Sequence, residues 1–168
     1  MIQCYTDLFG IHYEVQSSLG DDAELGGNKM YTEKVMMHFR SPHNMGELKN
    51  PDAMGEVGNP QCGDMMKVTM KINPETKIIE DIKFMTFGCV SAIACSSVTT
   101  DILKGKTIGE AKNLTKQDIV NELGELPAIK LHCSVLSNEA VKKAIDEYEI
   151  KHGIKNAETL NEDSKIQT

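Results

Sequence analysis

The sequence predicts an α+β domain in which helices pack on one face of a small antiparallel sheet of about three strands. Apolar and polar residues alternate over residues 65–72, which is the period of a half-buried strand. Turn residues at 73–76 lead from it into a return strand at 77–87, so these two strands form a hairpin. A short segment at 56–61 is expected to add the third strand.

A short helix is expected ahead of the sheet. Thr32 is a suitable N-cap for it, and Ser41-Pro42 ends it. Its apolar side is expected to consist of Val35, Met36 and Phe39.

Helices are also expected after the hairpin. The small and apolar residues that follow Cys89 predict a helix that ends near Gly105. Thr107 and Thr115 have the positions of caps for two short helices, the second of which stops at Gly124. A long amphipathic helix then has an apolar face formed by Leu136, Ala140, Val141, Ala144, Ile145 and Tyr148.

The length of 168 residues suits one domain, which we place at residues 31–152. It is expected to lie between a leader extension at 1–30 and a polar C-terminal tail at 153–168. The leader is expected to be flexible or loosely docked. The alternative is that Tyr5, Phe9, Ile11 and Tyr13 form a short strand or a partner contact.

Composition excludes several classes of function. Lys plus Arg total 18 against 25 for Asp plus Glu, and this formal net charge of −7 argues against a nucleic-acid surface. No apolar run approaches the roughly 20 residues of a membrane span. The acidic N-terminal region also differs from an Arg-rich organellar presequence. We therefore expect a cytoplasmic protein that binds neither nucleic acid nor membrane.

The five cysteines are too few and too scattered for a disulfide scaffold, and they favour metal or thiol chemistry. Cys62 precedes a strand, Cys89 lies between a strand and a helix, and Cys133 lies near the head of a helix. Ends of elements can converge at one tip of a domain. Gly88 permits a sharp turn, and the helix start behind it favours a thiolate at Cys89. Cys4 is expected to belong to no site.

Asp64 and His132 stand beside these cysteines and are candidates for a fourth ligand. Three thiolates with one oxygen or imidazole suit tetrahedral zinc or iron. Each candidate also has another reading. Asp64 could form an Asx-type bond in a turn, and His132 could orient a thiolate or protonate a departing sulfur.

Three segments around these cysteines resemble the signature segments of the U-type iron-sulfur cluster assembly scaffolds, the IscU and NifU N-terminal family. They are Gly58-Asn59-Pro60-Gln61-Cys62-Gly63-Asp64, Phe87-Gly88-Cys89-Val90-Ser91-Ala92-Ile93-Ala94 and Leu131-His132-Cys133-Ser134. The resemblance runs from about Tyr31 to about His152. The interval between Cys89 and Cys133 lacks the insertion typical of the zinc-bearing SufU branch, so the chain resembles the IscU branch.

The resemblance implies that Cys62, Cys89 and Cys133 are cluster ligands and that Asp64 or His132 completes the set. It implies a scaffold and carrier, not an enzyme. Such proteins assemble a [2Fe-2S] cluster, and sometimes a [4Fe-4S] cluster, from iron and from persulfide sulfur delivered by a cysteine desulfurase, and transfer it to apo-proteins. Cys133 is the expected persulfide acceptor, by resemblance and because a helix start favours thiolate there. Cys89 is the second choice.

Two positions depart from the family pattern. Val90 and Cys95 stand where family members usually have glycine and serine. Because Cys95 lies on the apolar stripe of its helix with Val98 and Ile102, we expect it to be buried and structural.

The resemblance also implies partners. Residues 126–130 resemble the family's recognition loop for a DnaK-class chaperone, with Ala128 in place of its second proline. Alternatively, Pro127 simply starts a helix. Since only three cysteines of one chain would hold the cluster, a second subunit is expected to share or shield it, which gives a homodimer in the loaded form.

Two other functions remain open. The same ligands would serve a zinc-bound sulfurtransferase that accepts persulfide from a cysteine desulfurase, although the missing insertion argues against it. They would also serve a structural zinc module that only binds partners. Hydrolysis by Cys133 and His132 is a poor fit, because adjacent residues rarely aim at one another and no orienting group is evident.

Overall fold

The computed structural model describes residues 5–6, 12–13, 31–59 and 63–154. The predictions for Cys4, Phe9, Ile11 and Cys62, and the polar tail from residue 155 onward, lie outside the described residues. Within the predicted leader, β1 (Tyr5–Thr6) and β2 (His12–Tyr13) form a short antiparallel pair.

The main sheet has three antiparallel strands in the order β3-β4-β5, as predicted. They are β3 (Ala53–Asn59), β4 (Asp64–Ile72) and β5 (Ile79–Phe87). The strand predicted at 56–61 is β3. It begins earlier than predicted, at Ala53, because its pairing with β4 extends as far as Met70. In the hairpin turn, Asn73 Oδ1 accepts hydrogen bonds from the backbone N–H groups of Glu75 and Thr76, so the turn chemistry read from the sequence is present.

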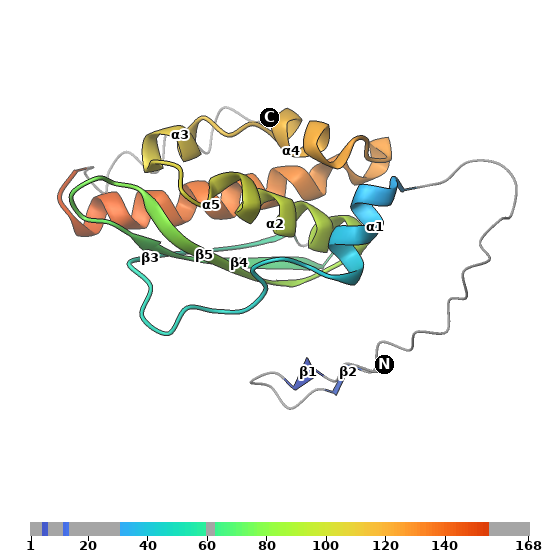
Figure 1. The fold of residues 1–168 in the computed structure, drawn as a ribbon, viewed down its shortest axis with the longest axis horizontal. Helices are drawn as coiled ribbons and strands as arrows, with labels where there is room; N and C mark the ends of the chain where they lie inside the picture. Colours follow the sequence, from blue (N-terminus) through green and yellow to red (C-terminus); the bar gives the residue numbers. More distant parts are fainter. Residues whose placement is uncertain (1–4, 7–11, 14–30, 60–62, 155–168) are drawn as a thin grey trace, which may run out of the picture.

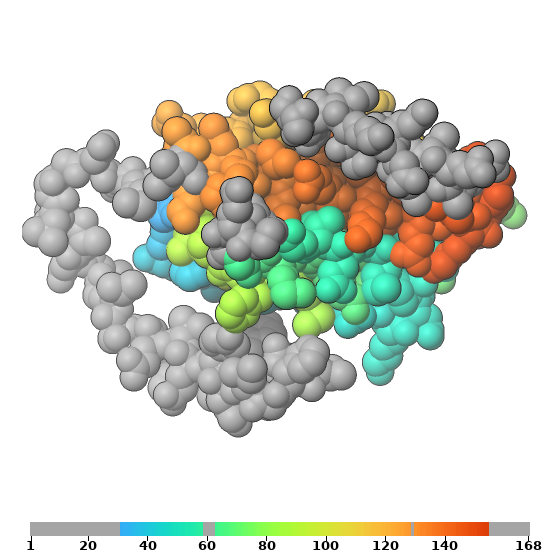
Figure 2. Space-filling view, turned by 180° about the vertical axis from the view of Figure 1, so that it is seen from behind, coloured from blue at the N-terminus to red at the C-terminus, as the bar shows by residue number. Residues whose placement is uncertain are grey.

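The helices cover one face of this sheet, which confirms the predicted layer arrangement (Figure 1). The long α5 (Leu131–Lys151) packs on β3 and β4, and α2 (Val90–Leu103) packs on β5. Figure 2 shows the orange and red surface of α5 directly above the green surface of β3. Three shorter helices complete the layer: α1 (Glu33–Arg40), α3 (Ile108–Lys112) and α4 (Lys116–Leu123). In the described part of the chain, no helix combines the length and apolar character needed to cross a bilayer.

The predicted caps are present. Thr32 accepts a hydrogen bond from Val35 N–H at the start of α1, and Gly124 ends α4 with a φ of 88°. Thr107 forms a capping box with Glu110, as the sequence indicates, and Thr115 forms one with Asp118.

The buried side of α1 differs from the prediction. Val35 and His38 are buried, whereas Met36 and Phe39 are only partly covered. His38 turns inward because α1 packs against α2, where its Nδ1 lies 2.9 Å from the Ser97 hydroxyl. A buried polar group is tolerated when it has such a partner, which an apolar pattern does not reveal.

The spacing between α5 and the sheet depends on Gly55 in β3. A Cβ atom at this position would lie 2.1 Å from Ala140 O and 2.6 Å from Ala144 N, both of which belong to the backbone of α5. The absence of a side chain therefore sets how closely α5 lies on β3.

We expect Gly55→Ala to lower the free energy of unfolding by more than about 2 kcal/mol, because two backbones would have to separate. Gly109→Ala is the matched control, since its Cβ would meet only Thr107 Oγ1 at 3.9 Å. It should stabilise the protein by up to about 1 kcal/mol through helix propensity. Urea unfolding of the two variants measures both effects, and equal midpoints would contradict the close packing.

Candidate metal centre

Three elements meet at one end of the sheet and bring the candidate ligands together. Asp64 is the first residue of β4, Cys89 is the N-cap of α2 just after β5, and Cys133 lies in the first turn of α5. Met65 pairs with Phe87 in the antiparallel register, so the start of β4 lies beside the end of β5. The predicted convergence is therefore confirmed for these three residues.

Two of the separations between these side chains are close to those of ligands that share one metal ion. Cys89 Sγ lies 3.6 Å from Cys133 Sγ, which in turn lies 3.9 Å from Asp64 Oδ2. With metal–sulfur bonds of about 2.3 Å, two sulfurs on a tetrahedral ion lie about 3.8 Å apart. The arrangement thus needs little movement to bind zinc or iron.

Asp64 is held in a buried position, with 5% of its surface exposed. Gly88 makes room for it, because a Cβ there would lie 3.0 Å from both Asp64 Cγ and Oδ1 and 2.9 Å from Ala92 Cβ. The chain bends at Gly88, as the sequence predicts, but with a φ that is not positive. The close approach of the carboxylate, and not the backbone conformation of the turn, therefore requires glycine at this position.

His132 belongs to the same group of side chains. One ligand atom each of His132, Asp64 and Cys133 lies within 4.8 Å of the others. Its Nε2 is buried and has no hydrogen-bond partner among the described residues. Because buried polar atoms are normally paired, this nitrogen fits the role of a metal donor.

The environment of Cys133 contradicts the expectation of a thiolate. Burial raises the pKa of this thiol, and the nearby Cys89 raises it further. Only 1% of Cys133 is exposed. A helix start contributes about 1 kcal/mol, whereas full burial can shift a pKa by several units, so burial dominates. In the metal-free protein Cys133 is therefore a protonated thiol.

Two further residues near these sulfurs, Lys130 and Cys95, have raised pKa values. Cys89 is the main cause of a raised pKa at the partly exposed Lys130 ammonium, which places a positive charge near the sulfurs. Cys95 is fully buried in the core, and burial raises its pKa to about 12. The predicted burial of Cys95 is confirmed.

The alternative interpretation of residues 126–130, in which Pro127 starts a helix, agrees with the structure. Pro127 is the N-cap of the 3-10 helix η1 (Ala128–Lys130), which continues directly into α5. The segment thus positions the first turn of α5, which contains His132 and Cys133.

Sequence reasoning missed a second group of metal-ligating side chains. His38, His43 and Asp101 each offer one ligand atom within 4.8 Å of the others. The two histidines flank the end of α1, but Asp101 lies 58 residues beyond His43 on another helix. No local spacing signal could have joined the three.

A family model and similar proteins from other organisms both relate this chain to one family. Residues 30–155 match the family model described as NifU-like N terminal domain. The chain is 51% identical over 123 residues to a protein of Aquifex aeolicus named iron-sulfur cluster assembly scaffold protein IscU, covering 73% of this chain and 78% of that one. A protein of the same name from Escherichia coli K12 is 48% identical over 128 residues, covering 74% and 98%.

A solved structure supports the same fold. The structure of the N-terminal part of a nitrogen-fixing NifU-like protein from Brucella abortus superposes with a TM-score of 0.59 at 21% identity. The match covers 73% of this chain and 96% of that one.

Burial predicts a clear order of thiol reactivity in the metal-free protein. With iodoacetamide at pH 8, Cys89 should be alkylated at least about tenfold faster than Cys133 or Cys95, because only thiolates react and buried thiols stay protonated. Because its pKa is raised, Cys133 loses its proton at a higher pH than an ordinary thiol does. Its alkylation rate should therefore keep rising with pH above the usual thiol pKa of about 8.5. Peptide mass spectrometry measures each site. Equal rates for Cys89 and Cys133 at pH 8 would contradict the buried position of Cys133.

Proposed function

The chain belongs to the NifU-like N-terminal domain family, and on this premise we propose that it is a scaffold for iron-sulfur cluster assembly. The cluster is built on the chain and then passed to apo-proteins. The observation that carries the proposal is the position of Cys133 Sγ, which lies 3.6 Å from Cys89 Sγ and 3.9 Å from Asp64 Oδ2. Relatives with 48% to 51% identity carry scaffold names, which supports it.

The ligand set is Cys62, Cys89 and Cys133, with Asp64 as the fourth ligand and His132 as the alternative. Cys62 is two residues before Asp64 in the chain. Soft thiolates suit iron-sulfur chemistry, while a carboxylate is a harder and poorer match. Three strong ligands and one weak ligand suit a protein that must both hold and release its cargo. We propose [2Fe-2S] as the main product and [4Fe-4S] as a further one.

Ligand binding at Cys133 requires the loss of its proton. The Cys133 thiol can donate a hydrogen bond to Asp64 Oδ2, 3.9 Å away, so this carboxylate is one acceptor for that proton. A coordinating metal ion deprotonates a thiol outright. Cluster assembly is therefore expected to release protons, and assembly should become more favourable as pH rises.

Sulfur delivery is proposed to begin with Cys133 as persulfide acceptor. Once the thiol has released its proton to solvent, the Cys133 thiolate attacks the outer sulfur of the desulfurase persulfide and a new S–S bond forms on Cys133. The old S–S bond breaks to leave the desulfurase thiolate, which takes up a proton in turn. Oxidation level is conserved in this exchange. Because Cys133 is only 1% exposed, the first turn of α5 must open for the attack. The half-buried Cys89 is the second choice.

Exposed apolar residues beside the site support docking of partner proteins. Phe87 is 67% exposed, its pairing partner Met65 is 50% exposed, and Leu131 is 41% exposed. Such side chains next to a functional site are typical of interaction surfaces. We propose a cysteine desulfurase and apo acceptor proteins as partners, a DnaK-class chaperone at 126–130, and a homodimer in the loaded form. A cytoplasmic location and a non-enzymatic role complete the proposal.

A zinc-bound sulfurtransferase is the second candidate. The specific observation in its favour is that the sulfur–sulfur and sulfur–oxygen separations match a single tetrahedral ion. Metal analysis of the purified protein separates the two functions.

Anaerobic incubation with iron, cysteine and a cysteine desulfurase should produce visible charge-transfer bands with equal iron and acid-labile sulfide. The Cys62→Ser, Cys89→Ser and Cys133→Ser variants should lose both, because each removes a thiolate ligand. Cys95→Ser is the matched control and should retain the cluster, since Cys95 lies in the core. A colourless protein with one tightly held zinc would favour the sulfurtransferase.

Asp64→Ala should slow transfer of the cluster to an apo-protein several-fold, because the labile carboxylate ligand would be gone. The transfer rate is followed by the change in the visible spectrum after mixing with an apo-ferredoxin. Glu47→Ala, an exposed carboxylate on another segment, is the control and should transfer normally. A rate for Asp64→Ala that equals or exceeds that of the unmodified protein would disprove the role of Asp64.

A further inference from the structure

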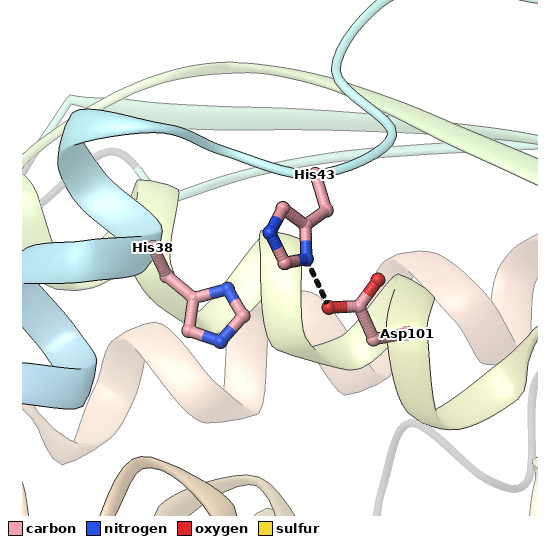
Figure 3. Close-up of side chains that lie close together, drawn as sticks. All are labelled: His38, His43 and Asp101. Atoms are coloured by element: carbon pink, nitrogen blue, oxygen red, sulfur yellow. Dashed lines mark hydrogen bonds and ion pairs between the residues drawn. The ribbon is translucent and has the colours of Figure 1, made fainter.

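A second group of potential metal ligands lies between α1 and α2. His38 comes from α1, His43 from the segment that follows it, and Asp101 from α2 (Figure 3). Figure 3 shows the two imidazoles and the carboxylate pointing toward one another. His43 Nδ1 lies 2.6 Å from Asp101 Oδ2, and the two ring centroids are 5.0 Å apart.

Neighbouring groups hold these three side chains in place. Ser97 Oγ accepts a hydrogen bond from the backbone N–H of His43 at 2.8 Å and lies 2.9 Å from His38 Nδ1. Asn44 Nδ2 donates to Asp101 Oδ1 at 2.9 Å. Hydrogen bonds of this kind orient the ligands of metal sites.

The backbone next to His43 is also fixed. Asn44 O accepts a hydrogen bond from Phe84 N–H, and Gly46 N–H donates to Phe84 O at 2.8 Å. The segment that bears His43 is therefore attached to β5, and the position of the imidazole is set before any ion binds.

We propose that His38, His43 and Asp101 form a second metal site, which binds a divalent ion of the zinc type with water in the remaining position. Two imidazoles and one carboxylate are a common ligand set for zinc. His43 and Asp101 have side chains that are 49% and 35% exposed, so an ion and its water have a path from solvent.

Binding requires only small movements of the three side chains. Ligand atoms about 2.0–2.1 Å from one tetrahedral zinc lie about 3.3 Å apart. The ligand atoms already lie within 4.8 Å, and the shortest pair would open from 2.6 Å.

This site is separate from the cysteine centre. Cys89 is at the N-terminal end of α2, and Asp101 is 12 residues further along it. At 1.5 Å per residue this corresponds to about 18 Å of helix, so no ion can bridge the two sites.

Co²⁺ titration of the full chain distinguishes the two sites. Thiolate ligands give an intense sulfur-to-cobalt charge-transfer band, whereas nitrogen and oxygen ligands give only weak visible bands. The unmodified protein should bind Co²⁺ at both sites. His43→Ala should keep the charge-transfer band and lose at least about tenfold in affinity at the nitrogen-oxygen site. Asp101→Asn should do the same, because a neutral amide replaces the carboxylate.

His152→Ala is the matched control, since His152 contacts Tyr148 on α5 and belongs to neither group. It should bind Co²⁺ as the unmodified protein does. Zn²⁺ should also raise the melting temperature of a Cys89→Ser, Cys133→Ser protein, and adding His43→Ala should abolish that rise. Binding by thiolates only, or a nitrogen-oxygen signal that survives His43→Ala, would overturn the proposal.

Discussion

The antiparallel pairing of β4 with β5 is the constraint on which the cysteine centre depends. Met65 of β4 pairs with Phe87 of β5. Asp64 directly precedes Met65, and Cys89 follows Phe87 by two residues, so both lie at the same end of the sheet. A slip of one residue would move every side chain of a strand to the opposite face. The alternation of buried and exposed residues in β4 makes such a slip costly, because it would expose Met66, Val68 and Met70. Core packing thereby fixes the positions of the ligands.

The ligands differ in how far they are withdrawn from water. Cys89 is half-buried, whereas Cys133 and Asp64 are buried. Burial favours the neutral thiol while the site holds no metal, and a metal ion reverses this preference by replacing the proton. The same low-water environment that keeps Cys133 unreactive then strengthens its bond to the ion. Proton release and ligand binding are thus one event at this residue.

Local sequence signals predicted the elements and their caps, because alternation and capping are properties of neighbouring residues. Thr32, Thr107 and Thr115 cap helices as expected. The failures concern contacts across the fold. The inward side of α1 depends on Ser97 of α2, and the protonation of Cys133 depends on what packs over the start of α5. Such contacts join residues far apart in the chain, so no spacing rule reveals them.

The small residues of α2 explain how one helix serves two sites. Its buried side chains include Ala94, Cys95 and a series of serines and threonines, which let α1, β5 and α5 approach closely. Buried hydroxyls need partners, and Ser96 and Thr100 find them in the helix backbone, at Ala92 O and Ser97 O. Ser91 Oγ and Thr99 Oγ1 have no partner among the described residues. Ser97 instead contacts His38 and the backbone of His43. A larger apolar residue there would fill the space but remove the group that contacts the His38 imidazole and holds the backbone of His43. The polarity of α2 at Ser97 is therefore a requirement of the two histidines that this residue positions.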